Sequence, residues 1–176
     1  EIIMLNGFAS YALTASSVAP VCLTIGFLAY ITEHNIMLYT SLGIAVFSVI
    51  LCFFIIKATL KISKTTTKNL ISASPADREI TNYFLTYLFP LIAGKDTFTD
   101  WRVAVFFYVS LFFYIKHSSS YSFNPIVSVL FRYKFYEAED DTGVSFVLMA
   151  RKPILDAKIS GMKVIKLTEH TYIYQN

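Results

Sequence analysis

Few side chains in this sequence have the types and spacing that acid–base or nucleophilic chemistry requires. Asp140 and Asp141 are neighbouring carboxylates, which is the arrangement nearest to a catalytic pair. Thr142 and Gly143 follow them, and Gly143 is placed to adopt the positive φ of a hairpin turn. We interpret both aspartates as turn-forming residues rather than as a catalytic dyad or a calcium site.

Metal-ligating and nucleophilic side chains are equally scattered. His34, His117 and His170 are far apart, and Cys22 and Cys52 lie within apolar runs without metal-ligand spacing. The chain lacks a glycine-rich phosphate loop, a GxSxG nucleophile elbow and an HExxH zinc helix. The sequence therefore predicts no catalytic residues, no metal and no cofactor, and we expect a protein that is not an enzyme.

Basic residues form two patterns that indicate binding. Lys57, Lys61, Lys64 and Lys68 recur at roughly helical spacing and would lie on one face if the helix before them continued. We favour contact with anionic lipid headgroups for these lysines, and docking of an acidic partner is the alternative. The second pattern, near the C-terminus, is predicted to bind a partner protein and consists of Arg132, Lys134, Arg151 and Lys152.

The elements that carry these residues are strongly apolar. Hydrophobic residues make up 55% of the 176 residues and charged residues only 15%, whereas about a quarter of residues are charged in soluble domains. Residues 8–31 and 36–56 contain no acidic or basic side chain, and each run reaches the roughly 20 residues that a helix needs to cross a bilayer. A signal peptide would show one short apolar core after a basic start, so we predict two transmembrane helices.

Two shorter apolar segments, residues 75–93 and 101–117, are predicted to cross the membrane as well. A re-entrant half-helix is the alternative for residues 75–93. Lysine and arginine gather in residues 57–79 and are absent from the turn at Glu33, which places residues 57–79 and the C-terminus in the cytoplasm. The predicted fold class is thus an α-helical membrane bundle of about four transmembrane helices, occupying residues 1–122.

The first span carries signals for close helix packing. Ala12 and Ser16 are small residues spaced four apart, and Pro20 follows at the same spacing. Small residues let helices approach closely in lipid, and proline kinks a helix because it removes a backbone donor. We predict that these three residues shape the packing of this helix.

Residues 123–176 are predicted to form a small β-rich domain in the cytoplasm. Asn124 and Pro125 are expected to cap a short apolar turn, and turns at Gly143 and Gly161 separate about four strands. About 50 residues bury too little surface to be stable alone. We therefore expect the sheet to pack on the membrane domain, on neighbouring subunits or on a partner.

This arrangement resembles the KwaA family, the membrane subunit of the bacterial Kiwa anti-phage system. The resemblance covers most of the chain as architecture: four hydrophobic helices, a basic cytoplasmic loop, and a β-rich tail that opens with Phe123-Asn-Pro-Ile126 and Arg132-Tyr-Lys-Phe-Tyr-Glu137. It implies a homo-oligomer in the bacterial inner membrane that holds a cytosolic DNA-binding partner, KwaB. It carries over no catalytic residues.

Two functions stay open on the sequence alone. The first is a non-enzymatic scaffold or sensor that contacts membrane lipids, assembles with copies of itself and recruits a cytosolic effector resembling KwaB. The alternative is a small oligomeric membrane channel or transporter. We favour the scaffold, because the predicted spans lack the mid-membrane charges of a transport site. The net charge of +3 gives no indication of direct nucleic-acid binding.

Overall fold

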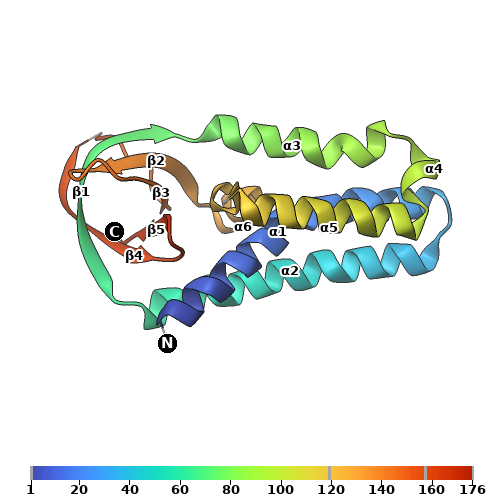
Figure 1. Ribbon diagram of the computed structural model, residues 1–176, viewed down its shortest axis with the longest axis horizontal. Coiled ribbons are helices and arrows are strands. Elements are labelled where there is room, and N and C mark those ends of the chain that lie inside the picture. The colour runs from blue at the N-terminus through green and yellow to red at the C-terminus, as the bar shows by residue number, and fades with distance from the viewer. Residues whose placement is uncertain (1, 119, 157, 176) are drawn as a thin grey trace.

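The computed structural model describes residues 2–118, 120–156 and 158–175. Helices form one end of an elongated molecule and a small β-barrel forms the other (Figure 1). The helices are α1 (Ile2–Ile31), α2 (Asn35–Ile62), α3 (Asp77–Ile92), α4 (Lys95–Phe98), α5 (Trp101–His117), the 3-10 turn η1 (Ser120–Phe123) and α6 (Pro125–Phe131). The strands are β1 (Thr65–Pro75), β2 (Lys134–Asp140), β3 (Ser145–Ala150), β4 (Ile159–Lys166) and β5 (Thr171–Tyr174).

The first two helices form an antiparallel hairpin, because only a short polar turn interrupts their apolar sequences. They contain 30 and 28 residues, and Glu33 in the turn adopts a left-handed φ of 60°. Within the described residues, two helices are long and apolar enough to cross a membrane, and they are α1 and α2. The predicted spans 8–31 and 36–56 fall inside them.

α1 lies at the centre of the bundle and packs against α2, α3 and α5. It bends along its length, as Figure 1 shows, and Pro20 lies inside it. Ala12 and Ser16 are buried. α1 also contacts α2 at Gly26, where an added Cβ would come within 2.8 Å of the Ser41 hydroxyl oxygen.

Of the four predicted spans, two correspond to described helices that are long and apolar enough to cross a membrane. α3 and α5 contain 16 and 17 residues, which corresponds to about 24 and 26 Å at 1.5 Å per residue, and a bilayer core is about 30 Å thick. The predicted span 75–93 is shortened because Pro75 is the last residue of β1. Both helices nevertheless run alongside α1 (Figure 1).

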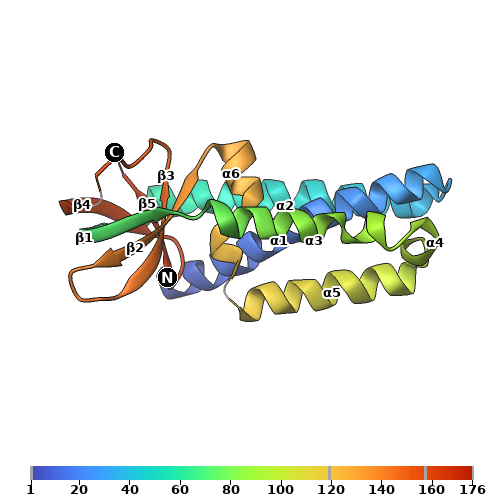
Figure 2. The ribbon, with the colours of Figure 1, turned by 90° about the horizontal axis from the view of Figure 1, so that it is seen from above.

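The connections of the bundle divide between its two ends. The turn between α1 and α2, and the short α4, lie at the end away from the barrel (Figure 2). The connections from α2 to β1, from β1 to α3 and from α5 through α6 to β2 lie at the barrel end. This division agrees with the prediction that residues 57–79 and the C-terminal region lie on the same side of the membrane.

The strands close into a barrel in the order β1-β2-β3-β5-β4. The first part of β1 pairs with β4 and its last part with β2, and the register shifts on both sides of Leu70. β3 and β5 are parallel, and the other pairs are antiparallel. This is the strand arrangement of five-stranded OB-type barrels, in which two neighbours share a long first strand and β3 is parallel to β5. Here α3 to α6 are inserted between β1 and β2.

The barrel differs from the predicted sheet of four strands within residues 123–176. Its first strand comes from residues 65–75, so the expected division of the chain at residue 122 leaves this strand out. The sequence of β1 is rich in serine and threonine and resembles a loop. Its neighbours in the sheet lie far along the chain, and Leu70 is the buried residue by which β1 itself contributes to the barrel interior.

Two clusters of apolar side chains hold the barrel in place. The interior is filled from all sides by Leu70, Tyr136, Ala138, Phe146, Leu148, Ala150, Met162 and Val164. Residues that alternate with these on the strands point outward, and Phe135, Val147 and Met149 join the core of the helical bundle. The barrel therefore packs on the bundle, as expected for a domain of this size.

Candidate functional surfaces of the barrel

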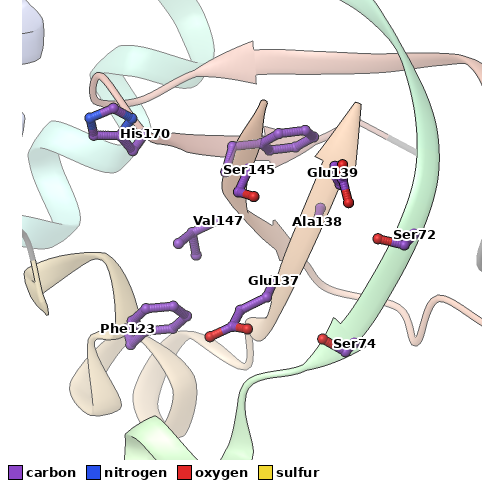
Figure 3. Close-up of a pocket in the computed structure, with 10 residues that line it drawn as sticks. Ser72, Ser74, Phe123, Glu137, Ala138, Glu139, Ser145, Val147 and His170 are labelled. Carbon is purple, nitrogen blue, oxygen red and sulfur yellow. The ribbon is translucent and has the colours of Figure 1, made fainter. Parts of the chain in front are cut away.

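The outer face of β1, β2 and β3 carries a hollow of about 380 Å³ (Figure 3). Because side chains alternate along a strand, Tyr136 and Ala138 fill the barrel while Glu137 and Glu139 point outward and are exposed. The ladder places Ser72 of β1 opposite Glu139, and Val147 of β3 opposite Glu137. The hollow is lined by Ser72, Ser74, Phe123, Glu137, Ala138, Glu139, Ser145, Phe146, Val147 and His170.

The charge of this face is negative. Within the described part of the chain, no lysine, arginine or histidine forms an ion pair with Glu137 or Glu139. Phe123 and His170 border the face on one side (Figure 3), and the backbone N–H of Val147 donates to the carbonyl of His170 at 2.7 Å. We name the exposed carboxylates of Glu137 and Glu139, together with Phe123 and His170, the acidic face.

Asp140 lies at the end of the same strand but points inward and serves the turn. Its carboxylate accepts from the ammonium of Lys68 at 2.6 Å, from the hydroxyl of Thr142 at 2.5 Å and from the N–H of Val144 at 3.1 Å. The Lys68 ammonium, followed by the Thr142 hydroxyl, holds the pKa of Asp140 well below its usual range. The interpretation of Asp140 as a turn-forming residue is consistent with these contacts.

The structure separates the four lysines predicted to share one helix face. α2 ends at Ile62, so Lys57 and Lys61 are exposed on the helix while Lys64 lies beyond it. Lys68 belongs to β1 and pairs with Asp140. The condition for a common face, a continued helix, is not met because the chain turns from helix to strand between Ile62 and Thr65.

The predicted partner-binding residues Arg132, Lys134, Arg151 and Lys152 come together at the barrel end that faces the bundle. The ladder places Lys134 opposite Ala150, next to Arg151. Arg132 and Arg151 line one groove of about 420 Å³ with Phe53, Leu130 and Phe131. Lys134 and Lys152 are exposed and are not part of the lining of this groove.

Asn124 connects the barrel end to the centre of the bundle. This fully buried side chain caps α6 by accepting from the N–H groups of Ile126 and Val127, at 2.9 and 3.3 Å. Its amide group donates to the carbonyl of Leu13 at 2.9 Å and to the hydroxyl of Ser16 at 2.6 Å. The expected cap is confirmed, and it also fixes α6 to α1.

Comparison with known proteins decides the family. No curated protein and no solved structure matches the chain. The family model described as anti-phage protein KwaA matches residues 9–173. The chain belongs to the KwaA family. This match confirms the predicted resemblance and gives the protein a role in anti-phage defence.

The KwaA match extends from α1 to β5 and so includes both the helical bundle and the barrel. The acidic face and the Arg132–Arg151 groove both lie within the matched residues. In the described part of the chain, no group of three or more His, Cys, Asp or Glu side chains is arranged to hold a metal ion.

Reasoning from the sequence missed the acidic face, although one signal for it was present. Glu137 and Glu139 alternate with Tyr136 and Ala138, and this period of two predicts that both carboxylates point away from the barrel interior. The serines of β1 gave no such signal, because the sequence did not predict a strand there. The hollow exists only once β1 is placed beside β2.

Proposed function

We propose that this KwaA-family chain is a non-enzymatic membrane subunit of an anti-phage defence complex, which assembles with further copies and holds a cytosolic effector at its barrel. In this proposal α1, α2, α3 and α5 all lie in the bacterial inner membrane, and the barrel lies in the cytoplasm. Family membership supports the role in defence. The polarity of the bundle supports the membrane location.

The observation that carries the proposal is that the bundle buries small hydroxyl side chains within its apolar core while large apolar side chains cover its outer surface. Thr14, Ser16 and Ser17 of α1 are 0% exposed, whereas Phe47 of α2 and Phe106 of α5 are 67% and 74% exposed. Removing such an apolar side chain from water is worth about 1.5–3 kcal/mol, so a soluble bundle would bury it. In lipid the same arrangement is favourable, because acyl chains cover the apolar outer surface. The buried hydroxyl groups form hydrogen bonds within and between helices.

The distribution of this apolar surface also argues against a soluble core helix. Most of α1 is buried, as in a soluble protein, but most of α2 is exposed. The exposed apolar side chains of α2 and α5 include Ile36, Tyr39, Ile44, Val46, Phe47, Ile50, Phe54, Trp101, Val105, Phe106, Phe113 and Tyr114. An exposed apolar surface of this extent is expected to face lipid or other protein rather than water.

The short helices α3 and α5 fit the same location. A helix shorter than the hydrocarbon thickness is accommodated by local thinning of the bilayer or by polar residues that reach the interface. Trp101 is 65% exposed at the start of α5, away from the barrel, where an interfacial aromatic residue belongs. Lys57, Lys61 and Lys64 are exposed at the barrel end, which supports a cytoplasmic barrel.

The alternative, a small oligomeric channel or transporter, gains no support from the buried hydroxyls of α1. The hydroxyl of Thr14 donates to the carbonyl of Ser10 at 2.7 Å, and the hydroxyl of Ser17 donates to the carbonyl of Leu13 at 2.9 Å. These buried groups are satisfied within their own helix, so they do not need water. They act as packing groups in the present arrangement.

The acidic face is the surface that we assign to the effector. Glu137 and Glu139 are exposed carboxylates without a described cationic partner, and Phe123 and His170 add aromatic contact area. Carboxylates pair with the lysines and arginines by which a DNA-binding protein contacts phosphate. They repel nucleic acid itself, so the occupant is a basic protein surface.

Capture of the effector tests this assignment. We expect Glu137→Lys, alone and with Glu139→Lys, to reduce co-purification of the system's cytosolic effector by about tenfold or more, because charge reversal at a paired site costs several kcal/mol. Asp156→Lys is the matched control, since Asp156 is exposed outside the acidic face. Equal capture by the Glu137 variant and the control would exclude the acidic face as the effector site.

A further inference from the structure

A groove at the junction of bundle and barrel combines two kinds of surface. It is lined by Phe53 of α2, Leu130 and Phe131 of α6, Arg132 at the end of α6, and Arg151 directly after β3. Its volume is about 420 Å³. Three apolar side chains and two guanidinium groups thus share one concave site.

The apolar part of the groove continues the exposed surface of α2. The rings of Phe53 and Phe131 lie 5.4 Å apart between their centroids. Phe53 and Leu130 are 38% and 57% exposed, and Phe54 next to them is exposed as well. A hydrocarbon chain lying on α2 can therefore enter the groove without crossing a polar barrier.

The cationic part of the groove lacks a described counter-ion. The guanidinium carbon of Arg151 lies 5.1 Å from the centre of the Tyr133 ring, and the ammonium of Lys57 lies 4.3 Å from the centre of the Phe53 ring at the margin of the groove. Neither Arg132 nor Arg151 forms an ion pair with a described carboxylate. Guanidinium groups are suited to bidentate hydrogen bonds with phosphate oxygens.

The backbone at Arg132 is a second, independent observation. This residue ends α6 in the left-handed conformation, with φ 58° and ψ 36°. Glycine is the usual residue at such a helix end, because a Cβ is sterically disfavoured in the left-handed conformation. An arginine at this position is explained if its guanidinium group has a binding role.

We propose that this groove binds an anionic phospholipid of the cytoplasmic leaflet. The phosphate accepts from the guanidinium groups of Arg132 and Arg151, and an acyl chain packs on Phe53 and Leu130. Basic pockets beside membrane helices on the cytoplasmic side suit such headgroups. The proposal rests on the membrane location given above, and it assigns Arg132 and Arg151 to lipid instead of to the effector.

Lipid retention by the purified full chain tests the proposal. The chain is exchanged into detergent with phosphatidylglycerol or phosphatidylcholine, and bound lipids are counted by native mass spectrometry. We expect selective retention of phosphatidylglycerol and a loss of about tenfold or more in Arg132→Gly with Arg151→Gln, because two charge-assisted contacts are removed. Glycine is compatible with the left-handed backbone at residue 132, so this change preserves the fold.

The matched control is Lys152→Gln with Lys163→Gln, which removes the same charge from exposed positions outside the groove. Equal retention of the two lipids, an equal loss in the control, or full displacement of phosphatidylglycerol by millimolar inorganic phosphate would overturn the phospholipid site. Alkaline carbonate extraction of cell membranes separates this result from the wider proposal. A chain that stays in the membrane but shows no lipid preference refutes the groove alone, whereas an extracted chain refutes the membrane location and the groove together.

Discussion

At the scale of residues, Asp140 joins three strands with one carboxylate. It holds the turn between β2 and β3 through Thr142 and Val144, and it receives the ammonium of Lys68 from β1. Lys68 also lies 4.7 Å from the centre of the Phe146 ring and 4.9 Å from that of Tyr172. The Lys68–Asp140 ion pair therefore fixes β1 to the rest of the barrel. In the sequence, α3 to α6 separate β1 from the other four strands.

Acid should weaken this connection. The depressed pKa of Asp140 means that its contribution to stability is complete above the unfolded value near 4, and is lost as the pH falls from there through the folded value. We expect Asp140→Asn to lower the melting temperature of the detergent-solubilised chain by several degrees at pH 7. The difference from the unmodified chain should shrink between about pH 4 and pH 2. A constant difference over the whole range would contradict the role of this ion pair.

At the scale of elements, the hairpin of α1 and α2 depends on small side chains. Ala19, Cys22 and Ala45 form a buried cluster between the two helices. A Cβ added at Gly26 would come within 2.8 Å of the Ser41 hydroxyl oxygen, so the backbones approach closely there. At Gly43, on α2, an added Cβ would meet nothing within 4 Å.

This contrast gives a matched pair of substitutions. Gly26→Leu should destabilise the chain by about 1–3 kcal/mol, because a larger side chain forces α1 and α2 apart. Gly43→Leu should be neutral or stabilising, since it gains helix propensity without a clash. Thermal unfolding in detergent measures both. Equal effects of the two substitutions would show that the contact between α1 and α2 at Gly26 does not determine the stability of the hairpin.

Sequence patterns predicted the long elements and missed the strand that has only distant partners. The uncharged runs of α1 and α2 and the Asn124–Pro125 cap are local signals, and each is present in the structure. β1 has a polar sequence and is stabilised by residues of β2 and β4 far along the chain, so no local pattern predicts it. The acidic face and the Arg132–Arg151 groove depend on such distant pairings as well, which is why residue spacing alone could not define them.

At the scale of the whole molecule, the barrel and the bundle form one unit. Phe135, Val147 and Met149 of the barrel belong to the same apolar cluster as Val127 of α6 and Ile115 of α5. Asn124 adds hydrogen bonds from α6 to α1. The barrel is thus held at one end of the bundle, with the acidic face and the Arg132–Arg151 groove on different parts of its surface.

The membrane location and the cytoplasmic barrel are tested most directly by cysteine labelling in intact cells. The two single variants are Thr97→Cys and Asp156→Cys. Residue 97 lies in α4 at the end of the bundle away from the barrel, and residue 156 lies in an exposed loop of the barrel. The native Cys22 and Cys52 are buried. With a maleimide that cannot cross the inner membrane, we expect residue 97 to be labelled in intact cells and residue 156 only after lysis. Labelling of residue 156 in intact cells, or of residue 97 only after lysis, would contradict this account.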